Sequence, residues 1–585
     1  MPRTPTKPTS NDTKPPVIPP PNAPILTQEN FEKELKGLAA RAKEETWGKW
    51  AGEQAWILLQ SATLLSLAAV YSNISQLTLS PVYGSIPASI WHSKGVMAAC
   101  FLGWSTNLLI RRHVVKKPAE LLPLIAAYIP VVQFTFFKFS DVFGPNYGPL
   151  ILESLTFIPL LLLSVSCTAT HLDNLEMNPG RLQWLSDAAP GILSYMFYKI
   201  VETFSGKYIS ETIGNSVWQT RLGYQMLLTA LYMPFAPPKK ALLMMPAIFH
   251  WSLMNLHVPV QFTTNRLNAD LNSRGWNLID RKESITGYVS VLENPSTFKV
   301  MRCDHSLLGG EWLAPTKAFM PEPIYGVFVM LEAVRLVGVP VEIADEEASA
   351  LVIGLGIGTT PAALMQHGID TTIVEIDPVV HDYATKYFNL PTGHTKVIQD
   401  AVIYASEAVI SGQKYDYVIH DVFTGGVEPV NLFTLEFLTD LHRILKPGGV
   451  IALNYAGDLL LPSARIVIHT IKTVFPSCRI FREHPRDNFE DSSADFTNMV
   501  IFCINSDAPI NFRKPVPRDF LSSGTRESFL VPKHEVLEEH MAIQEEDGVL
   551  LRNGTERFRK WQEQNALGHW AVMRTVLPKE IWENW

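Results

Sequence analysis

The chain is poor in cysteine and in concentrated positive charge. Five of its 585 residues are cysteines, and they lie far apart without a C-x-x-C pair. This spacing argues against a zinc site or a disulfide framework, and it predicts free thiols in a reducing compartment. The net charge is −8, and the sequence contains no long basic run that would suit a nucleic acid. We therefore expect no metal and no nucleic-acid partner.

The first residues also lack the apolar core of a signal peptide. Residues 1–27 are rich in Pro, Thr, Asn and Lys, a composition typical of a disordered tail. Residues 28–54 combine dense charge with helix formers, and Phe31, Leu35 and Leu38 recur on one side. This pattern predicts an amphipathic helix that lies before or on a membrane.

Charge nearly disappears from residues 55–262. Six apolar windows follow one another there, and most approach the roughly 20 residues needed to cross a bilayer. They are 55–77, 95–110, 119–137, 147–168, 222–235 and 241–258. One such window suits a buried core helix, but six in succession predict a multi-pass membrane domain with lipid as its partner.

The distribution of charge predicts an orientation for this domain. The strongest basic cluster, at residues 111–117, is expected to stay in the cytosol together with the N-terminus. Six spans then return the C-terminal half to the cytosol. A seventh apolar window, 188–204, would reverse that orientation, but it contains Lys199 and Glu202. We interpret it as an interfacial helix.

Residues 350–377, ALVIGLGIGTTPAALMQHGIDTTIVEID, combine an apolar run, a glycine turn, a helical segment and a second apolar run ending in an acid. The glycines are Gly354, Gly356 and Gly358, and the acid is Glu375. Glycines let the backbone turn tightly, a helix N-terminus offers free N–H groups, and the acid accepts from ribose hydroxyls. Thr359 occupies the position where a dinucleotide fingerprint needs its third glycine. The G-x-G-x-G spacing therefore favours a sulfonium nucleoside such as S-adenosylmethionine, which has no pyrophosphate.

The surrounding sequence predicts an α/β domain. Strand-like runs at 287–292 and 297–303 predict a hairpin within a linker region, 263–345. Strands and helices then alternate through residues 346–510, which predicts a mostly parallel sheet with ligands at its carboxyl ends. An extension, residues 511–585, follows this domain.

Three of the predicted strands end in acids, Glu375, Asp400 and Asp421. Because the carboxyl ends of parallel strands meet at one edge, we expect these carboxylates to lie close together. Asp400, with Ala401 beside it, is placed to accept from an adenine amino group. Asp421 is placed near the reacting sulfonium, where it would stabilise that cation or take a proton from a nucleophile. His420 is a second candidate base, although a strand-end histidine is more often simply packed.

Residues 284–505 resemble the spermidine synthase-like family. The resemblance rests on the hairpin, the GLGIG turn, the VEID strand end, the QDA loop and the LKPGGV turn, and residues 420–438 are similar to the membrane-fused members. It implies a seven-stranded, Rossmann-like sheet of the class I methyltransferase type, with 479–483 and 499–504 as its last strands. The expected fold is thus α/β, preceded by a small β-hairpin region and fused to an N-terminal α-helical transmembrane domain.

Two positions depart from the family pattern for aminopropyl transfer. Ile357 replaces the acid of the family's GGGDGG turn, and Thr424 replaces the second acid of its D-S-S-D-P loop. A polyamine needs such carboxylates, because an unpaired buried ammonium is very costly. Tyr325 retains part of the family's tyrosine-containing acceptor segment, and Asn454 and Tyr455 end a strand beside the predicted acceptor pocket.

These features predict a membrane-anchored transferase with its catalytic domain in the cytosol. Its co-substrate is S-adenosylmethionine or decarboxylated S-adenosylmethionine. Three interpretations stay open: polyamine aminopropyl transfer, methyl transfer to an amine or another small-molecule acceptor, and a degenerate domain that only binds the nucleoside. Aminopropyl transfer follows the family name, whereas methyl transfer fits Ile357 and Thr424 better. Whether the chain forms a homodimer also stays open.

Overall fold

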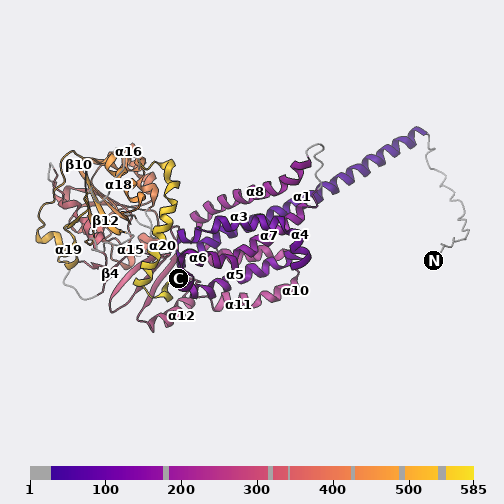
Figure 1. Cartoon of the computed structure of the whole chain (residues 1–585), viewed down its shortest axis with the longest axis horizontal. Coiled ribbons are helices and arrows are strands. Elements are labelled where there is room, and N and C mark those ends of the chain that lie inside the picture. The colour runs from indigo at the N-terminus through magenta and orange to yellow at the C-terminus, as the bar shows by residue number, and fades with distance from the viewer. Residues whose placement is uncertain are drawn as a thin grey trace, which may run out of the picture.

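The computed structural model describes residues 28–175, 183–313, 320–339, 343–422, 429–485, 495–537 and 548–585. An N-terminal helical bundle and a C-terminal α/β domain lie at opposite ends of the molecule, with an antiparallel sheet between them (Figure 1). The predicted disordered tail, residues 1–27, lies outside the described residues. The predicted amphipathic helix, residues 28–54, forms the first half of α1, which continues without a break to Tyr83.

The long helices of the bundle run back and forth between an end beside the α/β domain and a far end, from which the start of α1 projects (Figure 1). They are α1 (Gln28–Tyr83), α3 (His92–Ser105), α5 (Leu122–Phe136), α7 (Phe157–Leu172), α8 (Gln183–Thr212), α9 (Arg221–Tyr232) and α11 (Met245–Leu253). Helices α2 (Ser85–Ser89), α4 (Asn107–Leu109), α6 (Ser140–Leu155), α10 (Pro238–Ala241) and α12 (Gln261–Asn272) connect or flank them. Among the described residues, the seven helices named first above make successive passes between the two ends (Figure 1).

Helix α8 contains residues 188–204, which we expected to form an interfacial helix. It lies along α1 in the bundle (Figure 1). The side-chain amide of Asn73 donates to the main-chain oxygen of Glu202 at 2.8 Å, and the Tyr198 side chain is fully buried. The structure therefore makes this segment a full member of the bundle, in contrast to the sequence-based interpretation.

An antiparallel sheet joins the bundle to the α/β domain. Its strands, in spatial order, are β1 (Asn277–Glu283), β2 (Tyr288–Glu293), β3 (Phe298–Cys303), β4 (Ser306–Trp312) and β5 (Glu322–Pro323). Strands β2 and β3 confirm the predicted hairpin. Arg221 at the start of α9 forms ion pairs with Glu283 of β1 and with Asp304, the latter at 3.0 Å. These buried contacts hold the bundle against the sheet.

The α/β domain contains an eight-stranded sheet in the order β13-β11-β12-β10-β9-β6-β7-β8. The strands are β6 (Ser349–Ile353), β7 (Asp370–Glu375), β8 (Thr395–Ile398), β9 (Tyr415–His420), β10 (Leu445–Asp458), β11 (Ser477–Arg482), β12 (Phe496–Ile504) and the two-residue β13 (His534–Glu535). The central strands β8, β7, β6, β9 and β10 pair in parallel, and β12 runs antiparallel to its neighbours. Apart from β13, this is the predicted seven-stranded sheet.

Helices cover both faces of this sheet. They are α13 (Gly326–Leu331), α14 (Thr359–Gln366), α15 (Pro378–Tyr387), α16 (Ala401–Ser411), α17 (Leu435–Ile444), α18 (Pro462–Val474) and α19 (Gly524–Phe529). Alternation along β6 shows why: Ala350 and Val352 enter one hydrophobic core, and Leu351 and Ile353 enter the other. A strand that is buried on both faces typically has a continuous apolar sequence, as β6 has from Ala350 to Ile353.

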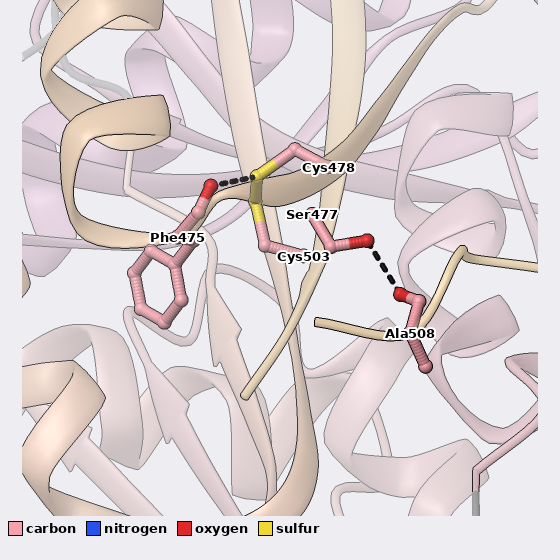
Figure 2. The surroundings of a disulfide bond; sticks show 5 residues. All are labelled: Phe475, Ser477, Cys478, Cys503 and Ala508. Atoms are coloured by element: carbon pink, nitrogen blue, oxygen red, sulfur yellow. Dashed lines mark hydrogen bonds between the residues drawn. A yellow bond between two sulfur atoms is a disulfide. The ribbon is translucent and has the colours of Figure 1, made fainter. Parts of the chain in front are cut away.

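A disulfide links Cys478 of β11 to Cys503 of β12 (Figure 2). The two residues lie directly opposite each other in the antiparallel register of these strands. Beside them, the Ser477 hydroxyl donates to the main-chain oxygen of Ala508 at 2.6 Å. The expectation of free thiols throughout is therefore wrong for this pair, because strand register and not sequence spacing brings the two sulfurs together. Cys100, Cys167 and Cys303 are free.

The last helices of the chain fill the junction between the two halves. Helix α20 (Arg559–Val576) lies between the α/β domain and the bundle, and α21 (Lys579–Glu583) follows it (Figure 1). The Trp570 indole donates to the main-chain oxygen of Val82 at 3.0 Å. The Arg302 guanidinium stacks 4.8 Å above the Trp582 ring. Part of the 511–585 extension is thus a structural connection.

Candidate nucleoside and acceptor site

The glycine turn after β6 brings three parts of the protein together. Gly354 and Gly356 have φ angles of 82° and 54°, a region that L side chains rarely adopt. A Cβ on Gly354 would lie 2.2 Å from the main-chain oxygen of Asp421, and one on Gly356 would lie 2.4 Å from that of Leu308. Glycine is therefore needed for the approach to β9 and β4. Gly358 is the N-cap of α14 in a left-handed conformation.

Glu375 ends β7 directly beside this turn. Its carboxylate accepts hydrogen bonds from the main-chain N–H groups of Leu355 and Asp377, each at 2.9 Å. The side chain is 8% exposed, and burial raises the pKa of Glu375 to about 7. Each carboxylate oxygen keeps a second lone pair, so the group can still accept from ribose hydroxyls. Its position fits the role predicted from the sequence.

Asp400 and Ala401 lie at the start of α16 and line the same cavity as Glu375. One Asp400 oxygen accepts from the main-chain N–H of Val402 at 2.8 Å and caps the helix. The residue is exposed, so its second oxygen remains accessible to a ligand. The structure thus places Asp400 at the predicted edge of the sheet and adds a capping role.

Asp421 follows β9, and its main-chain N–H donates to Ile353 at the end of β6 at 2.8 Å. The Asn454 amide on β10 donates to Asp421 Oδ1 at 2.8 Å and orients the carboxylate. Burial raises the pKa of Asp421 to about 6. Both side chains line the cavity. Asp421 therefore combines position and pKa for proton transfer near neutral pH.

Two predicted site residues lie elsewhere. His420 is fully buried, shares a hydrogen bond with the main-chain oxygen of Leu432, and has a pKa that burial lowers to about 4. Tyr455 is also buried, and its ring packs against Phe433. His420 is next to Asp421 in the sequence, and Tyr455 is next to Asn454; Asp421 and Asn454 both line the cavity. Because successive side chains of a strand point to opposite faces of the sheet, His420 and Tyr455 point away from the cavity. The structure thus places both side chains in the core and outside the cavity. For His420 this is the packed arrangement that is more common for a strand-end histidine, and for Tyr455 it corrects the predicted acceptor role.

Of the other predicted residues, Tyr325 lines the cavity as expected, and burial raises its pKa to about 12. Thr424 lies outside the described residues. Ile357 is buried against the antiparallel sheet, where a Cβ on Gly309 would lie 3.0 Å from it. An acid introduced at position 357 would therefore be buried in an apolar cluster and would not reach the cavity.

The cavity itself extends well beyond the nucleoside residues. Its volume is about 1330 Å³, above the roughly 300–1,000 Å³ of pockets for small molecules. Its walls include Gly356, Glu375 and Asp421 on the sheet edge, Ser306 and Leu308 of β4, and Asn565 and Met573 of α20. The sequence did not indicate the α20 wall, because nothing local marks a distant helix as part of a site. Within the described ranges no group of three or more His, Cys, Asp or Glu side chains is arranged to hold a metal ion.

Nucleoside binding is expected to release protons from Glu375. Burial raises the pKa of Glu375 to about 7, so part of the free protein carries a protonated carboxyl at pH 7. Ribose hydroxyls donate to the ionised form and lower this pKa, so binding should release protons. Titration calorimetry in two buffers of different ionisation enthalpy measures this release. A Glu375→Gln variant should lose it, and equal binding heats in both buffers for the unmodified protein would contradict the prediction.

The sheet order, the glycine turn and the acids at the strand ends define an α/β transferase domain of the methyltransferase type. The family model described as Spermine/spermidine synthase domain matches residues 331–482. A protein of Emericella nidulans named N-terminal histidine N-methyltransferase is 46% identical over 551 residues, 90% of this chain and 97% of that protein. The chain belongs to the family of that methyltransferase, and it is a transferase.

Two further comparisons are narrower. A polyamine aminopropyltransferase of Vibrio vulnificus is 40% identical over 108 residues, 18% of this chain and 36% of that protein. The crystal structure of a probable spermidine synthase from Corynebacterium glutamicum is 17% identical and has a TM-score of 0.35, covering 45% of this chain and 94% of that one. The match to the Vibrio vulnificus protein thus covers less than a fifth of this chain.

Proposed function

We propose that this protein transfers a methyl group from S-adenosylmethionine to a nitrogen of an N-terminal histidine. The main support is the 46% identity to the Emericella nidulans protein, which extends over the bundle as well as the catalytic domain. Polyamine aminopropyl transfer is less well supported, because the similarity to aminopropyltransferases covers a short segment.

The residues of the site suit this reaction. When bound at the glycine turn and Glu375, S-adenosylmethionine supplies an electrophilic methyl group. The accepting nitrogen forms its new bond to carbon as the carbon–sulfur bond breaks, and the product cation must then lose a proton. Asp421 accepts that proton through its carboxylate, which Asn454 holds in place. The product cation must lose a proton whether the methyl group is added to the amino nitrogen or to a ring nitrogen of the histidine.

A transfer assay tests the proposed function. We expect the full-length protein to add one methyl group to a peptide that begins with histidine and none to a matched peptide that begins with alanine, as measured by mass spectrometry. Titration calorimetry should show that S-adenosylmethionine binds at least as tightly as its decarboxylated form. Transfer of an aminopropyl group to a diamine, with no methylation of the histidine peptide, would overturn the proposal.

We also propose that the bundle crosses a membrane. Two helical stretches, Trp47–Tyr83 and Pro118–Leu155, are long and apolar enough to do so, although about half of each apolar window is buried inside the protein. Large apolar side chains are exposed on several bundle helices, including Phe101, Leu108, Phe204 and Leu242. Exposure of many large apolar side chains is unfavourable in water and favourable in lipid.

The seven passes favour an orientation opposite to the one expected from six spans. Basic residues gather at the far end of the bundle, at 111–117 and at Lys239 and Lys240. The positive-inside rule assigns this end, and the N-terminus, to the cytosol. The α/β domain then lies on the non-cytosolic side. The Cys478–Cys503 disulfide fits this orientation, since disulfides persist in oxidising compartments.

Protease protection tests the orientation. In sealed vesicles whose cytosolic face is outward, added protease should remove an N-terminal tag and leave the α/β domain intact. Mass spectrometry without reductant should recover Cys478 and Cys503 in one linked peptide pair. Cleavage of the α/β domain in intact vesicles would instead support six spans and a cytosolic catalytic domain.

A further inference from the structure

The cavity wall formed by β4 and α20 carries two polar side-chain atoms that have no hydrogen-bond partner among the described residues. Ser306, at the start of β4, is 2% exposed, and its Oγ makes no hydrogen bond among the described residues. Asn565, on α20, is 5% exposed, and its Nδ2 likewise has none. Both residues line the same cavity as Glu375 and Asp421. Buried polar groups are nearly always hydrogen-bonded, so this pair indicates a polar ligand at this wall.

The elements that carry these two groups are held rigidly. Arg574, also on α20, donates through Nε to Nε2 of His305 at 3.1 Å. His305 directly precedes Ser306 in the sequence. The same guanidinium forms an ion pair with Asp141 of the bundle at 2.8 Å. These contacts fix β4 and α20 against each other and against the bundle. Sites built on rigid elements are the ones that select ligands by position.

The chemistry of the two groups favours a peptide backbone as the ligand. The Asn565 amide nitrogen is a donor and needs a carbonyl or another acceptor, whereas a polyamine at neutral pH offers only N–H donors. A hydroxyl such as that of Ser306 pairs with either a carbonyl or an N–H group. A peptide that continues past its first residue offers both at regular intervals. A single amino acid is too small to fill a cavity of about 1330 Å³.

We propose that Ser306 and Asn565 form a subsite that binds the peptide backbone beyond the methylated residue, so that this protein acts on polypeptide N-termini in preference to single amino acids. This inference rests on the proposed methylation of N-terminal histidine. It assigns to α20 and β4 a role in substrate selection that is separate from the chemistry at Asp421.

Substrate length tests the subsite. The full-length protein is assayed with histidinamide and with a six-residue peptide that begins with histidine. We expect kcat/KM for the peptide to exceed that for histidinamide by about tenfold or more, as one or two added hydrogen bonds would give. Asn565→Leu and Ser306→Ala should each lower the peptide value about three- to tenfold and leave the histidinamide value unchanged.

Controls separate this role from damage to the fold. Thr575→Val, on an exposed part of α20 where the hydroxyl donates only to Val572 within the helix, should change neither value. S-adenosylmethionine affinity of each variant reports an intact nucleoside site. Equal kcat/KM for histidinamide and peptide in the unmodified protein, or an equal loss for both substrates in the two variants, would overturn the subsite. Failure to methylate any histidine substrate would instead overturn the proposed function itself.

Discussion

Replacing Asp421 with asparagine is expected to lower the rate of methyl transfer by roughly 10²–10⁴-fold, the usual contribution of a positioned acid or base. The amide keeps the size of the carboxylate but cannot accept the proton that the product cation must lose. S-adenosylmethionine affinity should change little, because Glu375 and the glycine turn remain. Single-turnover rates and titration calorimetry measure the two quantities separately. Asp382→Asn, at a carboxylate that is 63% exposed, serves as the matched control.

The pH dependence gives the same prediction a second readout. Burial raises the pKa of Asp421 to about 6, so the carboxylate is ionised, and able to act as a base, above that pH. The rate for the unmodified protein should therefore rise with pH through about 6. The Asp421→Asn variant should lack this rise. A full rate with an unchanged pH profile in that variant would remove Asp421 from the mechanism.

Replacing Glu375 with alanine is expected to weaken nucleoside binding by roughly 10- to 150-fold, which corresponds to about 1.5–3 kcal/mol for charge-assisted hydrogen bonds. The change also removes the acceptor for Leu355 and Asp377, whose N–H groups hold the turn. Glu375→Gln keeps one of these acceptors and should show a smaller loss of affinity. Both are measured by titration calorimetry with S-adenosylmethionine.

The control for this prediction is Glu407→Gln, a change at a carboxylate whose Oε2 accepts from the side chain of Gln399 at 3.1 Å. It should leave affinity unchanged. Circular dichroism and thermal melting establish whether each Glu375 variant is folded. Unaltered affinity in a folded Glu375→Ala protein would contradict the assignment of the ribose site.

The sequence alone determined the features that depend on short segments. The glycine turn, the strands that end at Glu375 and Asp421, and the hairpin at β2 and β3 all follow from patterns within about thirty residues. Alternation of strands and helices also predicted a mostly parallel sheet, because parallel strands need crossover connections that are usually helices. These predictions agree with the structure.

Predictions for single side chains were less accurate, because a shift of one residue along a strand moves the side chain to the opposite face of the sheet. His420 and Asp421 are neighbours in the sequence, yet one enters the core and the other lines the cavity. Likewise, Tyr455 lies in the core, whereas its neighbour Asn454 lines the cavity. The apolar character of the flanking residues is similar on both faces of a buried strand, so the sequence held no signal for this choice.

Only the tertiary structure decided which distant segments meet. Strand register joins Cys478 to Cys503, packing against α1 makes α8 a bundle helix, and α20 supplies a cavity wall about 200 residues after the glycine turn. Contacts of this kind depend on the closure of long loops and on the fit of whole faces, which local composition does not encode. The positions of the glycine turn and of Glu375 could therefore be predicted from the sequence, whereas the α20 wall of the cavity and the packing of α8 in the bundle could not.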